Sequence, residues 1–150
     1  PVEVGEGSII RSGSYLVGPV SIGEDCDIGP GVVILPSTSI GDSARIGPHS
    51  EVRNSIIMND ARIGSGAIVS DSVLGASSIL GDQMVVESGP CVVEVEETFL
   101  RSEFGAILSD NVTAGARVMT HAGTVVGSGA RIDSGCIIRG QIERESRVMG

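Results

Sequence analysis

The chain of 150 residues contains no Trp, one Tyr and two Phe, which excludes a core built on large aromatic side chains. Its apolar residues, 41% of the total, are mainly Ile and Val, and 22 residues are Gly. β-Branched side chains favour strands, and this apolar content is too high and too regular for a disordered chain. The length fits a single domain over 1–150, and the composition predicts an all-β fold with thin layers of small side chains.

Lysine is also absent, so the ten basic residues are all Arg and face 19 acidic residues, for a net charge of −9. This balance argues against nucleic acid and against anionic membranes as partners. The excess of acidic residues is unevenly distributed. Residues 1–100 carry four Arg and 14 acidic residues, whereas residues 101–150 carry six Arg and five acidic residues. The C-terminal third is therefore the part that could accept a phosphate-bearing ligand.

Cysteine is scarce, with Cys26, Cys91 and Cys136 far apart in the sequence. An odd number without a Cys-x-x-Cys motif argues against a disulfide framework and against a zinc site, so no metal is expected. No apolar run approaches the roughly 18 residues that span a bilayer, and no signal peptide is visible. These absences predict a cytoplasmic protein, and the start at Pro1 favours a fragment of a longer chain.

What the sequence does contain is a period of six. A helix needs apolar spacings of three and four and a plain strand needs two. A period of six instead fits a triangular coil with one short strand on each side, three strands in a turn, and corners made of Gly, Asp, Asn and Ser. The aliphatic positions are Val4, Ile10, Leu16, Ile22, Ile28, Ile34, Ile40, Ile46 and Val52, and the smaller residues that precede them by two are Ser8, Ser14, Val20, Cys26, Val32, Thr38, Ala44 and Ser50.

A second, longer repeat covers 53–69 and 70–86, with one copy directly after the other. Within it, 54–57 (Asn-Ser-Ile-Ile) aligns with 71–74 (Asp-Ser-Val-Leu). Each copy shortens one spacing of six to five, so we expect two shortened corners to stack in neighbouring coils.

The period is lost at 87–105, where an alternating segment and both Phe predict a loop or hairpin that leaves the coil. This excursion either reaches a neighbouring subunit or decorates the surface. The period resumes at Leu108 and runs to Ile138, which gives about eight coils and places Cys26 and Cys136 in equivalent inward slots. The charged segment 140–150 is expected to cap the open end.

The six-residue pattern resembles the hexapeptide repeat of single-stranded left-handed parallel β-helices, and only this resemblance implies the left-handed winding. The doubled motif at 54–64 and 71–81, with Gly18-Pro-Val-Ser-Ile-Gly23 and 112–138, further resembles the C-terminal tail of archaeal-type sugar-1-phosphate nucleotidylyltransferases. Those most similar are glucose-1-phosphate thymidylyltransferases and UDP-N-acetylglucosamine pyrophosphorylases. In that family a separate N-terminal α/β domain, with Mg²⁺, transfers the nucleotide, and its Gly-rich loop is absent from this sequence.

Some relatives also acetylate amino-sugar phosphates on the coil, with acetyl-CoA and a Pro-His-x-x-Tyr motif. Here Ser65 stands where the base would be and Ile68 where the Tyr would be. The Asn that follows one coil later falls near Ser88, and the Lys-rich segment is replaced by Arg101-Ser-Glu-Phe104. A Ser without a neighbouring base is a poor proton acceptor near neutral pH. The resemblance therefore implies no acetyl transfer of that kind and no cofactor in this chain.

Two His remain as candidate bases for a different acyl transfer. His49 falls at a corner, and His121 lies nearer the C-terminal Arg residues that could bind CoA phosphates, namely Arg117, Arg131 and Arg139. A structural or surface role for both His, and solvated Arg side chains, is the simpler interpretation. A γ-class carbonic anhydrase site needs three His around zinc and is not expected from two.

Two hypotheses follow for function. The first is a homotrimerising, non-acetylating β-helix tail of a nucleotidyltransferase of nucleotide-sugar biosynthesis, not catalytic by itself; closed assembly would cover apolar strips on the flat faces. The second is an acyl-CoA-dependent acetyltransferase acting on a sugar or amino-sugar phosphate, with acetyl-CoA as its cofactor.

Overall fold

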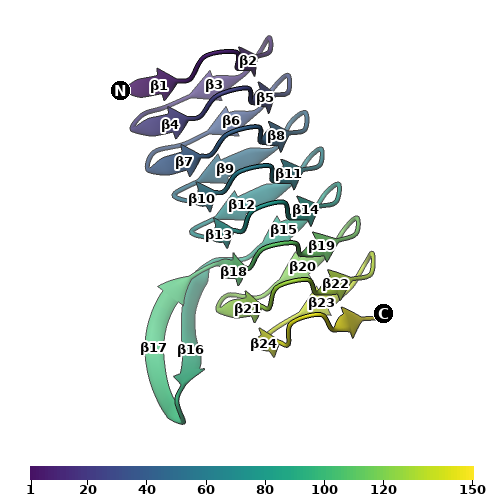
Figure 1. The fold of residues 1–150 in the computed structure, drawn as a ribbon. Coiled ribbons are helices and arrows are strands. Elements are labelled where there is room, and N and C mark those ends of the chain that lie inside the picture. The colour runs from purple at the N-terminus through teal and green to yellow at the C-terminus, as the bar shows by residue number, and fades with distance from the viewer.

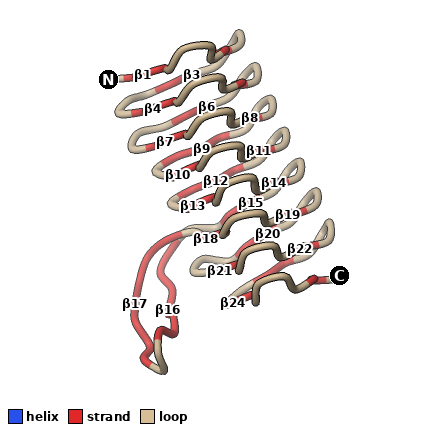
Figure 2. Tube along the Cα trace, viewed as in Figure 1, coloured by secondary structure: helices blue, strands red, loops and turns tan.

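A computed structural model describes residues 1–150 as a three-sided coil of strands and turns, with one hairpin that leaves it (Figures 1 and 2). Three parallel sheets form its faces. The first face contains β1 (Val2–Val4), β4 (Val20–Ile22), β7 (Thr38–Ile40), β10 (Ile56–Ile57), β13 (Val73–Leu74), β18 (Ala106–Leu108), β21 (Thr124–Val126) and β24 (Gln141–Ile142). The second contains β2 (Ile9–Ile10), β5 (Asp27–Ile28), β8 (Arg45–Ile46), β11 (Arg62–Ile63), β14 (Ile79–Leu80), β19 (Thr113–Ala114), β22 (Arg131–Ile132) and β25 (Arg147–Val148). The third contains β3 (Tyr15–Leu16), β6 (Val33–Ile34), β9 (Glu51–Arg53), β12 (Ile68–Ser70), β15 (Val85–Val86), β20 (Met119–Thr120) and β23 (Ile137–Ile138).

Each strand pairs in register with the strand one coil away, so equivalent residues stack along the coil axis. Val20 pairs with Thr38, for example, and Ile46 with Ile63. The chain passes from first to second to third face in every turn and makes about eight turns, with the left-handed winding that the resemblance implied (Figure 1). In other folds, a helix that connects two parallel strands imposes a right-handed crossover. This coil has no such helix between its strands. No helix of the structure could cross a membrane.

The core is a column of small and aliphatic side chains inside the prism, as the six-residue period predicted. Ile28, Ile34 and Val52 are fully buried, and Cys26 and Cys136 fill equivalent small slots as free thiols. Val4 and Ile10 occupy equivalent positions of the repeat but lie in the first turn, where they are 44% and 38% exposed. The narrow prism explains the shortage of aromatic residues, because each turn leaves room for only a thin layer.

Most corners turn on a residue with positive φ, most often Gly, Asp, Ser or Asn. These residue types adopt the left-handed conformation at the lowest cost. His49 (φ 62°) and Arg117 (φ 56°) hold this position in the same series of corners as Gly31 and Gly66. The corner predicted at His49 is therefore confirmed.

The two shortened corners stack as the longer repeat predicted, because Ser70 pairs with Arg53 and Val73 with Ile56. Asn54 Nδ2 donates a hydrogen bond of 2.8 Å to Asp71 Oδ1, and the hydroxyl of Ser88, one coil further, donates to the other carboxylate oxygen. Ser88 thus occupies the equivalent position one coil further, where the chain leaves the coil for the hairpin.

The excursion at 87–105 is an antiparallel hairpin of β16 (Gly89–Val95) and β17 (Thr98–Phe104), which hangs beside the lower coils (Figure 1). The expectation for 140–150 needs correction. This charged segment continues the coil, with β24 paired to β21 and β25 to β22, and Ile142 and Val148 pack against the core. In-register pairing with the preceding turn allows this, since only its outward positions are charged.

Candidate functional site

Three polar side chains from three successive coils line up on the third face. Val86 pairs with Thr120, and Thr120 with Ile138, inside the prism. The residue after each of these points outward because side chains alternate along a strand. Those residues are Glu87, His121 and Arg139. The sheet register therefore brings together an acid, an imidazole and a guanidinium that lie up to 52 positions apart in the sequence.

The acid and the imidazole are in direct contact. His121 Nδ1 lies 3.0 Å from Glu87 Oε2. The backbone N–H groups of both residues are bonded to the next coil, Glu87 to the Thr120 carbonyl at 2.9 Å and His121 to the Ile138 carbonyl at 2.9 Å. Rigid strands thus hold both side chains, which remain 42% and 33% exposed respectively.

The root of the hairpin closes one side of this site. A pocket is lined by Glu87, His121 and Arg139 together with Pro90, Cys91 and Val92 of the hairpin. The hairpin lies close to the coil, because a Cβ on Gly123 would come within 2.9 Å of the Cys91 sulfur. Gln141 Nε2 also donates to the Glu94 carbonyl at 3.0 Å. Cys91, which the sequence left outside the repeat, is thereby placed in the pocket.

This arrangement has the elements of a general base. A carboxylate at Nδ1 orients the imidazole and leaves Nε2 to accept a proton from a hydroxyl or amine. Arg139 supplies a positive charge of the kind that binds a phosphate. No group of three His, Cys, Asp or Glu residues in the chain could hold a metal ion.

The other predicted residues lie elsewhere. His49 is an exposed corner residue whose ring packs against Gly31. Arg117 sits at a corner and Arg131 points outward from the second face, so of the three Arg only Arg139 lines the His121 pocket.

The positions that replace the acetyltransferase motif do not form a cluster with His121. Ser65 is at a corner, where its backbone N–H donates to Asp82 Oδ1 at 2.9 Å. Ile68 is exposed on the third face, and Ser88 is bonded to Asp71. None of them lines the pocket that holds His121.

Sequence reasoning missed Glu87, the partner of His121. The signal was present, since 87 and 121 fall at equivalent positions of adjacent coils once 89–105 is set aside as an insertion. This equivalence was hard to see in the sequence because the hairpin interrupts the six-residue period directly after Glu87.

Comparison with known proteins gives a consistent result. A sequence model of the GMPPB C-terminal domain matches residues 16–143. In an alignment of length 106 that covers 66% of the chain, the sequence is 30% identical to the bifunctional protein GlmU of Methanococcus aeolicus and 32% identical to that of Methanococcus vannielii. The match spans only 26% of the length of each of these relatives.

Solved structures share the fold at low sequence identity. A Bacillus cereus protein assigned as an acetyltransferase, the product of the BC4754 gene, aligns with a TM-score of 0.67 and 13% identity over 99% of this chain and 78% of its own. A mutant of AntD, an N-acyltransferase from Bacillus cereus in complex with dTDP and coenzyme A, aligns with a TM-score of 0.57 and 12% identity over 95% and 75%. At such identities the likeness establishes the fold alone.

Proposed function

This chain belongs to the family of GMPPB C-terminal domains, the β-helix domains of sugar-phosphate nucleotidylyltransferases, and on this premise we propose that it is a trimerising domain that does not itself acetylate. Its parent protein would make a nucleotide sugar in the cytoplasm, with nucleotidyl transfer performed outside the coil. The observation that carries the proposal is a pair of apolar strips on two faces of the coil.

The longer strip runs along the third face. One column of outward positions on this face stacks from coil to coil and is apolar except for Glu51, with Tyr15, Ile68 and Ile137 exposed at 63%, 42% and 66%. The half-buried members are Val33, Val85 and Met119. Exposed apolar strips of this kind mark association surfaces.

The shorter strip lies on the first face, where Ile56, Val73, Ile107 and Val125 stack outward. A cyclic trimer needs two different patches on each chain, because its contacts are heterologous. The first and third faces meet at one corner. A three-fold axis facing that corner would pack the first face of one chain against the third face of the next.

Charge substitutions on the two strips test this arrangement. Ile68→Glu and Ile107→Glu should each convert the trimer to smaller species in light scattering, because each would bury an unpaired carboxylate. Thr113→Glu, at the same outward phase on the second face, is the matched control and should leave the mass unchanged. If only the Thr113→Glu control dissociates the trimer, the interface lies on the second face, which contradicts this arrangement.

The absence of acetylation is supported by Ser65 and Ile68, which offer neither a base nor a phenol at the positions where acetylating relatives carry them. Calorimetry with acetyl-CoA should therefore show no binding to the purified chain. Binding in the micromolar range, about −8 kcal/mol, together with acetyl transfer to an amino-sugar phosphate, would refute this part of the proposal.

The contact between His121 and Glu87 favours one alternative, an acyl-CoA-dependent transferase. Nε2 of His121 would take the proton of a substrate hydroxyl or amine while that atom attacks the thioester, and would return the proton to the departing thiolate. Arg139 would hold a phosphate of the donor or acceptor. Under this alternative His121→Ala abolishes transfer and Glu87→Gln reduces it, whereas His49→Ala leaves it unchanged.

A further inference from the structure

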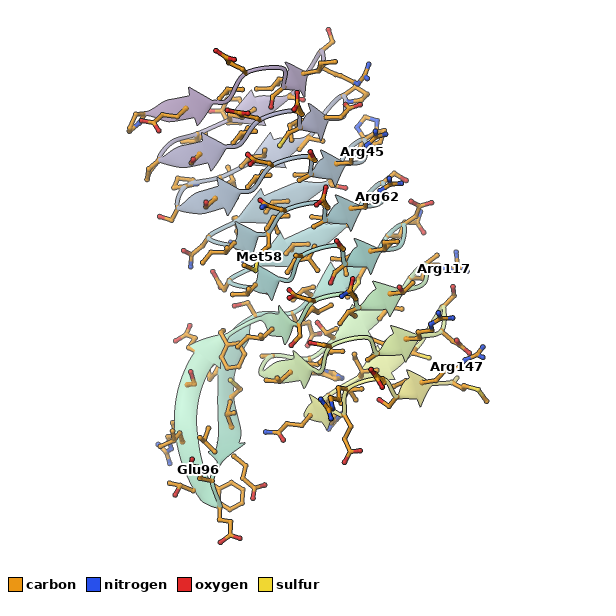
Figure 3. The ribbon with its side chains drawn as sticks, in the orientation of Figure 1. Arg45, Met58, Arg62, Glu96, Arg117 and Arg147 are labelled. Carbon is orange, nitrogen blue, oxygen red and sulfur yellow. The ribbon has the colours of Figure 1, made fainter.

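Two arginines on the second face have no acidic partner. The outward residues of four successive strands there are Asp27, Arg45, Arg62 and Ile79, each paired in register with the next. Neighbouring strands lie about 4.8 Å apart, so Arg45 and Arg62 stack as like charges on adjacent rungs (Figure 3). Like charges directly opposite one another destabilise a sheet.

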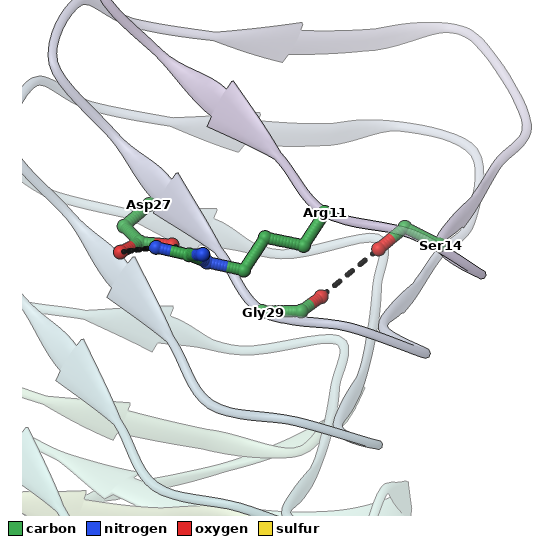
Figure 4. Close-up of polar contacts among 4 residues, drawn as sticks. All are labelled: Arg11, Ser14, Asp27 and Gly29. Atoms are coloured by element: carbon green, nitrogen blue, oxygen red, sulfur yellow. Dashed lines mark hydrogen bonds and ion pairs between the residues drawn. The ribbon is translucent and has the colours of Figure 1, made fainter.

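The nearest acidic residue, Asp27, is already paired with another arginine. Asp27 accepts two hydrogen bonds from Arg11, at 2.9 Å to Nε and 3.0 Å to Nη2 (Figure 4). These bonds, with Arg45 as a weaker contribution, hold the pKa of Asp27 below its usual range. Neither Arg45 nor Arg62 makes a hydrogen bond or an ion pair with any protein group through its side chain. Two guanidinium groups with all their donors free thus protrude from a chain whose net charge is −9.

A groove runs beside these two side chains. The residue after each inward position of the second face is Gly in the coils concerned, and a Cβ on Gly47 would lie 2.6 Å from the Gly64 carbonyl carbon in the next coil. Close stacking therefore demands Gly, and the row of glycines leaves no side chain to fill the surface. Arg11, Arg45 and Arg62 line the groove together with Asp27, Asp82, Pro30 and Pro48.

We propose that this groove binds a diphosphate group, either free pyrophosphate or the diphosphate of a nucleotide. A guanidinium group binds two phosphate oxygens at once. Two such groups on neighbouring strands therefore match the spacing of two linked phosphates. The positive stretch is only two rungs long. It is bounded by the Arg11–Asp27 pair on one side and by Ile79 and Asp82 on the other, so an anion longer than a diphosphate would lie against these acids.

The site is independent of the His121 pocket and does not rest on the proposed trimer. The apolar strips of that trimer occupy the first and third faces, so the groove of the second face stays open to solvent in the assembly.

Calorimetry at low ionic strength with pyrophosphate, a nucleoside diphosphate and inorganic phosphate tests the site. We expect pyrophosphate to bind about tenfold more tightly than phosphate, a difference of about 1.4 kcal/mol. Equal affinities for pyrophosphate and the nucleoside diphosphate would identify the diphosphate alone as the ligand, and a tighter nucleoside diphosphate would identify the nucleotide. No binding of either would overturn the proposal.

Substitution locates the binding. Arg45→Gln combined with Arg62→Gln should weaken pyrophosphate binding at least about tenfold, without a loss of thermal stability, since neither side chain has a hydrogen-bond or ion-pair partner in the protein and the two like charges oppose each other. The double variant Arg131→Gln and Arg144→Gln removes the same charge from exposed positions further along the coil and should bind as the wild type does. Equal losses in both variants would mean general charge attraction. A change of oligomeric mass with unchanged pyrophosphate binding would mean a protein contact, and either result contradicts the proposal.

Discussion

Thr120 occupies an inward position of the third face where the neighbouring coils place Val86 and Ile138. It is fully buried, and its hydroxyl is the one buried side-chain polar atom without a hydrogen-bond partner. Other inward hydroxyls are satisfied: Ser50 donates to the Gly64 carbonyl and accepts from the Ala67 amide. An unpaired buried hydroxyl destabilises the folded state.

Thr120→Val should therefore raise the free energy of unfolding by about 1 kcal/mol, because Val fits the slot and carries no orphaned hydroxyl. Urea denaturation at fixed protein concentration measures the change. Thr124→Val is the matched control, since Thr124 is equally buried but donates to the His121 carbonyl at 2.7 Å. That variant should lose about 1 kcal/mol. A loss of equal size in both would show that Thr120 is satisfied in solution.

Asp71 links its own corner to the coils on either side through hydrogen bonds from Ser88 and then from Asn54, which hold its pKa below the usual range. A lowered pKa means that the folded state favours the carboxylate. The stabilisation is thus fully present above the unfolded pKa of about 3.9 and is lost as the pH falls through the lower folded value.

The unfolding free energy of the wild type should accordingly exceed that of Asp71→Asn at neutral pH, and the gap should shrink as the pH falls from about 5 towards 2. Denaturant titrations across this range measure it. Asp60→Asn, at an exposed corner of similar φ (61°), corrects for the loss of one charge. A gap that stays constant with pH relative to this control would contradict the role of the carboxylate.

At the scale of elements, the hairpin is an insertion into a regular coil. Val69 to Leu74 spans five positions and the equivalent Val86 to Leu108 spans 22, so the excess of 17 equals residues 89–105. Its contacts with the coil are few, and Val92, Phe99 and Leu100 are at least half exposed.

Deletion of 89–105 joins Ser88 to Ala106 and restores a coil of the same length as the two before it. The deleted chain should keep the circular dichroism spectrum of parallel strands and unfold cooperatively. The hairpin leaves the corner that faces the proposed three-fold axis, so its loss should also weaken the trimer in sedimentation. Deletion of 72–88, a segment of equal length, removes one complete turn of the coil, with Met84 and Val86 of the core, and should destabilise the coil more. Loss of structure only in the hairpin deletion would show that the hairpin helps to fold the coil.

The sequence predicted what the narrow prism demands at every turn. The inward slots from Val20 to Val52, the thiols Cys26 and Cys136, and the stacked corners at 54 and 71 follow from steric limits that repeat locally. The pocket at His121 could be predicted only in part, because its partner Glu87 lies across the insertion and the hairpin that lines it has no repeat. The charged 140–150 segment was misjudged, since its outward charges masked the inward Ile142 and Val148.

For the whole molecule, the three faces carry different chemistry on one backbone. The second face bears the free arginines Arg45 and Arg62, whereas the first and third bear the apolar strips. Parallel in-register pairing keeps such columns separate, because each coil adds its residue to the column of the coil before. Apolar association and anion binding can thus reside on different sides of the prism without competing.

Sedimentation equilibrium of the purified chain tests the trimer most directly. A mass three times that of the 15.3-kDa chain, constant over a wide range of protein concentration and reduced by Ile68→Glu but not by Thr113→Glu, is the expected result. A mass equal to one chain at all concentrations, with the fold intact by circular dichroism, would contradict the proposal that this coil is an assembly domain.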